Sequence, residues 1–193
     1  MDRDELAERV GIIETMIADG RRDTEYWGWA FVLWGVGHLI AAFWGQAHAI
    51  AWPATMTACG VVMAVGAVRR SRRRGKTTTL GRALGALWTA IGIAMFVAMV
   101  GGIASDLAGG TVVTLFFLLM GTATFASGVI VRWPWWSGLG VLWWAVAVAS
   151  MVAPPDVTFW LFVGMALVGE VAFGAYMMVL ERRDEDHAEA TGP

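Results

Sequence analysis

The chain has 193 residues, of which 58% are hydrophobic and only 16% are charged, and its formal net charge is −2. This composition excludes an ordinary soluble domain and indicates a chain that is embedded in a membrane. The single cysteine, Cys59, excludes an intrachain disulfide framework and any CxxC metal or redox motif.

The first predicted element is an amphipathic helix over residues 2–19. Its apolar stripe consists of aliphatic residues at helical spacing, namely Leu6, Val10, Ile13 and Ile17. Residues 1–20 carry six acidic and two basic side chains, so an anionic lipid surface repels this helix. The pattern therefore predicts a protein partner. That partner is either the basic segment of the same or a neighbouring subunit, or a second copy of the helix in a short coiled coil.

Six transmembrane helices are predicted next, each long enough to cross a hydrocarbon core of ~30 Å. Their ranges are 26–44, 48–68, 83–103, 109–131, 137–153 and 157–180. Because residues 1–25 contain no continuous apolar stretch, the first span is expected to be an uncleaved anchor. The predicted fold class is all-α, an integral membrane bundle of six helices over residues 26–180. A cytoplasmic helix and hinge precede it over 1–25, and an acidic cytoplasmic tail follows over 181–193.

The positions of the basic residues predict the orientation of the bundle. All 14 lysine and arginine residues lie near the N-terminus, after the second span, at Arg132 or in the tail. Those after the second span form a predicted basic loop, namely Arg69, Arg70, Arg72, Arg73, Arg74, Lys76 and Arg82. The positive-inside rule places this loop and both termini in the cytoplasm of a bacterial inner membrane. The loop is either a topology determinant alone or also a site for anionic lipid headgroups.

Eight of the 12 tryptophans lie at the ends of spans and predict interfacial belts. They are Trp27, Trp29, Trp133, Trp135 and Trp136 on the inner side and Trp44, Trp52 and Trp160 on the outer side. Three others, Trp34, Trp88 and Trp143, recur in similar local sequences. This recurrence fits either three tandem helical hairpins or a chance repetition of Leu-Trp pairs.

Glu170 is the one formally charged residue inside a predicted span. Such residues are costly in a bilayer and are therefore functional candidates. The same helix face carries Ala166 and Gly174, and a face of small residues predicts close packing against another helix and not against lipid. Two interpretations stay open. Glu170 is either a proton or cation site, or a neutral carboxyl that donates an interhelical hydrogen bond.

His38, in the first span, is the nearest possible partner of Glu170, and the two form the candidate intramembrane polar site. If both helices are straight, His38 lies about 10 Å from Glu170 along the membrane normal, so no direct contact is expected. His38 shares its helix face with Ala41 and Ala42, which favours a buried packing role. No metal-ligand spacing accompanies it, so neither a metal site nor a cofactor is expected.

The start of the chain also resembles known sequences. The segments ELAERVGIIETMI, RR and YWGWAFVLWGVGHLI, which lie between Glu5 and Ile40, resemble the start of uncharacterised small bacterial multi-pass membrane proteins. In these proteins a short amphipathic helix precedes a W-G-W first span. The resemblance implies a multi-pass membrane fold and brings no activity, cofactor or site.

The sequence contains no hydrolase, kinase or dinucleotide-binding motif, although this alone does not exclude an enzyme. We expect a non-enzymatic integral membrane protein that acts as a regulatory or scaffolding partner through its N-terminal helix. The alternative is a small transporter or channel that uses Glu170 and His38. The expected partners are the lipid bilayer and either a second copy of the chain or another membrane or cytoplasmic protein, and no nucleic acid is expected.

Overall fold

The structure, a computed structural model, describes residues 5, 11, 27–48, 50–74, 79–104 and 109–190. Within these ranges every regular element is a helix, and six helical spans are long and apolar enough to cross a membrane. The first five are α2 (Gly28–Gly45), α3 (Ala51–Arg74), α4 (Thr79–Ala104), α5 (Gly109–Ile130) and α6 (Pro134–Val152). The sixth consists of α7 (Pro155–Met165), the π-helical segment η1 (Ala166–Ala172) and α8 (Phe173–Ala190). The predicted all-α, six-span fold is confirmed.

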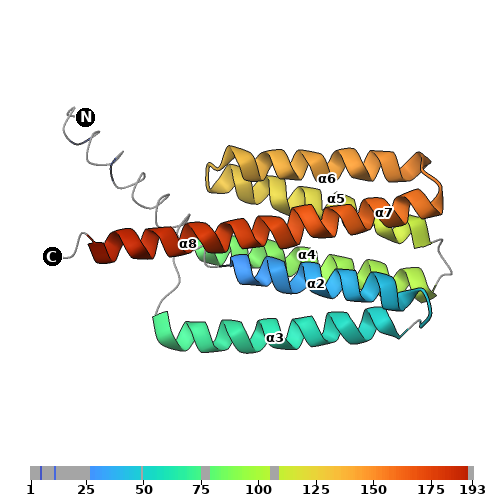
Figure 1. The fold of residues 1–193 in the computed structure, drawn as a ribbon, viewed down its shortest axis with the longest axis horizontal. Helices are drawn as coiled ribbons and strands as arrows, with labels where there is room; N and C mark the ends of the chain where they lie inside the picture. The colour runs from blue at the N-terminus through green and yellow to red at the C-terminus, as the bar shows by residue number, and fades with distance from the viewer. Residues whose placement is uncertain are drawn as a thin grey trace.

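The six spans form one bundle in which the packing is uneven (Figure 1). α5 and α6 make the most extensive contact, and α2 packs against α3, η1 and α8. α4 packs mainly on α5, while α3 lies at one edge of the bundle and packs on α2. Three equivalent hairpins would pair α6 with α7, but α6 packs far more on α5. The packing therefore does not follow the hairpin repeat, which stays a prediction from the sequence.

The close contact between α5 and α6 begins at the turn that joins them. Arg132 has a φ of 53°, the left-handed conformation that glycine usually adopts after a helix. The Arg132 N–H donates to the Val129 carbonyl and the Trp133 N–H to the Gly128 carbonyl, which is the pattern of a Schellman motif. Pro134 then begins α6, where its missing N–H leaves no helical hydrogen bond unmade. The chain therefore reverses direction within a very short connection.

Glycines set the contact between the first and last spans. Gly28 and Gly174 face each other so closely that a Cβ built on either one would lie 2.6 Å from the carbonyl oxygen of the other. Further along α2, a Cβ built on Gly35 would lie 2.8 Å from the Cβ of Glu170 in η1. Small residues allow such approach in membranes, where van der Waals packing drives helix association. These contacts align the two antiparallel spans so that Gly35 is level with Glu170.

The basic segment after the second span is more helical than predicted. α3 continues through Arg74, past the predicted end of the span at residue 68, and α4 begins at Thr79, before the predicted start at residue 83. Arginine is a good helix former, so the helix can continue beyond its apolar part. The described part of the predicted basic loop therefore consists of the end of α3 and the beginning of α4.

Two tryptophans that were assigned to an interfacial belt lie in the core instead. Trp133 and Trp136 are only 3% and 1% exposed, and they pack with apolar residues of α4 and α8. The α5–α6 turn directs them inward, so the belt prediction is wrong for these two. Trp135 and Trp160 are 81% and 63% exposed, as a position at the membrane interface requires.

Candidate functional site

Glu170 lies in the π-helical segment η1, within the sixth span. There the Phe173 N–H reaches the Val168 carbonyl, five residues back, in place of the α-helical spacing of four. Single π-helical turns inside α-helices occur frequently at functional sites. Glu170 is 1% exposed, so it faces protein, as its small-residue face predicted.

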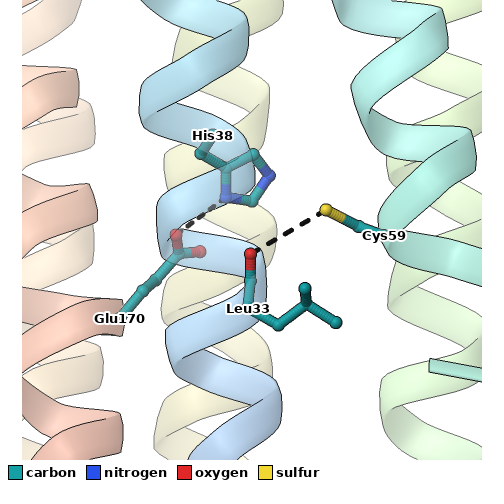
Figure 2. A network of polar contacts seen from close by, with 4 residues as sticks. All are labelled: Leu33, His38, Cys59 and Glu170. Atoms are coloured by element: carbon teal, nitrogen blue, oxygen red, sulfur yellow. Dashed lines mark hydrogen bonds and ion pairs between the residues drawn. The ribbon is translucent and has the colours of Figure 1, made fainter. Parts of the chain in front are cut away.

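His38 of α2 hydrogen-bonds directly to Glu170. Its Nδ1 lies 2.7 Å from Oε2 of Glu170, and the side chains are 7% and 1% exposed (Figure 2). This separation is in the range of charge-assisted hydrogen bonds, which are stronger than neutral ones. The two polar residues therefore form one site that joins the first span to the last.

The prediction that these side chains do not touch is wrong, and helix register and side-chain direction explain why. Gly35 is level with Glu170, so His38 lies only about 4.5 Å further along the axis, three residues of helix, and not ~10 Å. Side chains on a helix lean towards its N-terminus. Because α2 and the sixth span are antiparallel, His38 and Glu170 lean towards each other (Figure 2).

Aromatic rings from several helices enclose the His38 side of the pair. The Phe116 ring on α5 lies 4.8 Å from the His38 ring, and the Phe162 ring on α7 lies 6.0 Å away. Trp34 on α2 and Trp52 on α3 complete this aromatic enclosure at 5.8 and 6.3 Å. Apolar rings lower the local dielectric constant, which strengthens the hydrogen bond inside them.

The hydrogen-bonded pair can hold or release one proton. With that proton bound, the pair is neutral overall, whether the proton lies on the imidazole or on the carboxyl. The sequence indicated His38 as the nearest possible partner but no direct contact, whereas the structure brings the two side chains together. The two interpretations of Glu170, an interhelical hydrogen bond and a proton site, therefore concern the same pair of side chains.

Cys59 of α3 is a buried thiol near this pair. Its Sγ donates a weak hydrogen bond to the Leu33 carbonyl at 3.8 Å (Figure 2). Gly37 leaves room for the thiol, since a Cβ on Gly37 would lie 2.5 Å from Sγ. Among the described residues, no three His, Cys, Asp or Glu side chains are grouped so that they could hold a metal ion.

Of the other predicted site residues, those that the structure describes lie away from the pair. Arg69 is exposed on α3, and Arg82 is exposed near the start of α4, where it donates to the Thr79 hydroxyl. The remaining arginines of the basic segment belong to the end of α3, namely Arg70, Arg72, Arg73 and Arg74. Outside the described residues lie Lys76 and the predicted association helix, with Leu6, Val10, Ile13 and Ile17.

A set of buried hydroxyl and indole groups surrounds α5 and was not predicted from the sequence. Thr114 and Ser150 hydrogen-bond to each other at 2.7 Å, and the Trp88 N–H donates to the Ser127 hydroxyl at 3.1 Å. Thr124, on the same buried face of α5, is 0% exposed. The available signal was the placement of these hydroxyls on one face of an otherwise apolar helix.

No family model, no curated protein and no solved structure matches this chain. Its function is therefore inferred from the geometry of the His38–Glu170 pair and from the charge pattern.

Proposed function

We propose that this chain is a non-enzymatic integral membrane protein that acts as a regulatory or scaffolding partner. The observation that supports this is the enclosure of the His38–Glu170 pair, whose side chains are 7% and 1% exposed. A catalytic acid or base must come within hydrogen-bond reach of a substrate, and these groups are instead bonded to each other inside aromatic packing. The pair ties the first span to the last. The termini and the outer faces of the helices are then the parts that a partner contacts.

The outer faces of α3 and α4 form the barest apolar surface of the bundle. Only 17% and 11% of their span residues are buried, and they expose residues such as Val61, Val65, Phe96 and Val97. Six apolar spans with such faces support a lipid bilayer as the surroundings. We propose that lipid covers most of this surface and that a second copy of the chain, or another membrane protein, covers the rest.

The charge pattern supports an orientation with both termini in the cytoplasm of a bacterial inner membrane. Arg69, Arg82, Arg132 and the Arg182–Arg183 pair all lie at the end of the bundle where α3 ends and α4 begins. The connections at the opposite end contain no lysine or arginine. Short connections rich in basic residues stay in the cytoplasm during insertion.

Single cysteines in a Cys59→Ala background test this orientation. Cysteines in place of Gln46, Asp106 and Asp156 should react with an impermeant thiol reagent added to intact cells, because the uncharged or acidic connections face outward. Cysteines in place of residues 75 and 190 should react only after the cells are permeabilised, which also controls for their reactivity. Labelling at residue 75 in intact cells would reverse the orientation.

The N-terminal segment supports the partner role through its sequence. Ile13→Asp places a charge in the predicted apolar stripe and should weaken association of the full chain, either with itself or with a co-purified protein. Native mass spectrometry of the detergent-purified protein reports both. The control is Glu8→Gln, which lies off the stripe. If a chain without residues 1–20 keeps the same stoichiometry and the same partners, the scaffolding proposal loses its main support.

A small proton-linked transporter is the second candidate function, because His38 and Glu170 touch. Paired ionisable residues inside a membrane often mark ion or proton pathways, and this pair lies beside a π-helical turn. The two candidates differ in a measurement on proteoliposomes. A pH-driven flux that wild type supports and Glu170→Gln lacks would establish transport, whereas no flux from wild type favours the regulatory role.

A further inference from the structure

Three buried polar atoms lack a hydrogen-bond partner among the described residues, and all lie between the His38–Glu170 pair and the α5–α6 turn. They are Thr124 Oγ1, Trp136 Nε1 and Trp143 Nε1, on residues that are at most 1% exposed. A buried donor or acceptor without a partner is costly and usually marks bound water or another polar ligand. These atoms therefore indicate that a polar species binds inside this half of the bundle.

The register of α5 and α6 places these atoms in sequence along the bundle axis. Close contacts pair Gly121 with Trp144, Phe125 with Gly140 and Gly128 with Ser137. Residue 143 is therefore level with residue 122 of α5, and Thr124 lies about 3 Å from that level along the axis, in the direction of the turn. By the same register Ser127 and residue 136 follow at about 7.5 and 10.5 Å. The polar side chains thus recur at short steps towards the turn.

At the end farthest from the α5–α6 turn, this row of polar atoms reaches the level of the His38–Glu170 pair. Trp143 Nε1 would lie 3.1 Å from a Cβ built on Gly169, so the indole N–H lies against the residue before Glu170. We name Trp143, Thr124, Ser127 and Trp136 the polar strip. The polar strip extends from the level of the Glu170 carboxyl towards the end of the bundle that contains Arg132.

The opposite side of the pair is closed by the aromatic enclosure. Besides touching His38, the rings of Phe116, Phe162 and Trp52 touch each other, with centroids 5.2 Å apart for the two phenylalanines and 5.6 Å for Trp52 and Phe162. Beyond Phe116, the Thr114 hydroxyl is already bonded to Ser150, unlike Thr124. Among the described residues, the unpartnered polar atoms thus lie on the turn side of the pair, where the rings of Phe31, Trp133 and Phe173 also surround Trp136.

We propose that the polar strip binds a short file of water molecules, and that the His38–Glu170 pair exchanges protons with solvent along it, from the α5–α6 turn side alone. When the pair releases its proton, an O–H or N–H bond breaks and the neighbouring water takes the proton as hydronium, which leaves a carboxylate and a neutral imidazole. Uptake is the reverse. The proposal is independent of the regulatory role, because it concerns the pair's own proton.

Few other titratable groups face this pair. From α3 the Cys59 thiol lies within electrostatic reach of Glu170. The rings of Trp34 on α2, Phe116 on α5 and Phe162 on α7 lie against His38, and Trp143 on α6 lies against Gly169, the residue before Glu170. Among the described residues, no lysine, arginine or aspartate lies within the apolar part of any span. The exchange measured at His38 therefore reports the pair.

Hydrogen exchange at His38 tests the proposal in full-length protein that is labelled with 15N-histidine and reconstituted in lipid. NMR measures the rate at which the hydrogen on the His38–Glu170 pair exchanges with water, and His38→Gln identifies the signal among the three histidines. Thr124→Val removes one water partner and should slow exchange at least about tenfold. Thr124→Ser keeps the hydroxyl and should exchange like wild type.

Thr114→Val is the matched control, since it removes a buried hydroxyl from the same helix on the far side of the His38 ring contact. It should leave the exchange rate within about twofold of wild type. Equal rates for Thr124→Val and wild type, or equal slowing by Thr114→Val, would overturn the proposal. If Thr124→Val does not fold, Trp143→Phe removes the indole N–H and keeps a smaller aromatic ring in its place. The same slowing is expected there, and exchange at the wild-type rate would contradict the polar strip.

Discussion

Gly174→Ala should lower the free energy of unfolding by about 1 to 3 kcal/mol, and Gly174→Leu by more, because both force apart the first and last spans. A Cβ at residue 174 would lie 2.6 Å from the Gly28 carbonyl oxygen, 2.8 Å from the Phe31 Cβ and 2.9 Å from the Val32 nitrogen. Two of these three atoms are backbone, so no side-chain rotation relieves the clash. α2 must move, and the His38–Glu170 bond lengthens with it.

Gly92→Ala on α4 is the control for this prediction, because a Cβ there meets nothing within 4 Å. Alanine is the better helix former, so this variant should be as stable as wild type or slightly more stable. Thermal unfolding in detergent, followed by circular dichroism, compares the two variants. If both shift the midpoint equally, the first and last spans are not held together at their glycine contact.

Glu170→Lys should be the most damaging substitution at the polar site, at a cost of about 3 to 5 kcal/mol. The lysine would place a cation against His38, and the six span ranges predicted from the sequence contain no other acidic residue that could compensate it. Glu170→Leu should cost less, about 0.6 to 2 kcal/mol, because it removes one interhelical hydrogen bond without adding a charge. Glu170→Gln keeps both size and hydrogen-bonding capacity and should leave stability in detergent nearly unchanged.

A double-mutant cycle separates the bond from the general cost of substitution at these positions. His38→Phe combined with Glu170→Leu should be less destabilising than the sum of the single changes, since the second substitution removes a partner that is already unpaired. Thermal unfolding of wild type, the two single variants and the double variant gives the coupling free energy between the two side chains. Strict additivity would mean that the 2.7 Å contact contributes nothing to stability. Glu170→Gln serves as the size-matched control.

The spans were predictable from the sequence because their signal is local. Each is a run of apolar residues bounded by charged or turn-forming residues, and hydrophobic length alone identifies such runs. The predicted and observed ends of α5 differ by a single residue at Ile130. The error was larger at α3, whose arginines continue the helix after its apolar part has ended. Hydropathy detects where lipid contact ends, and this need not be where the helix ends.

The polar site was only half predictable, because it depends on how separate helices align. Glu170 and His38 were identifiable singly, since each is a polar residue on a small-residue face. Their contact follows from the level of Gly35 beside η1 and from opposite side-chain directions, which one sequence does not specify. The burial of Trp136 likewise depends on a turn built around a left-handed Arg132. Such turns are usually identified in a sequence by a glycine after the helix, and here that position holds an arginine.

The bond between the first and last spans has a consequence for synthesis of the chain. A ribosome completes α2 long before it reaches Glu170, so His38 enters the bilayer unpaired while the intervening spans are made. An unpaired polar side chain in lipid is energetically costly. Its partner arrives only when the last span is threaded through the insertion machinery. A chain that stops short of that span therefore lacks the carboxyl group that His38 contacts in the finished protein.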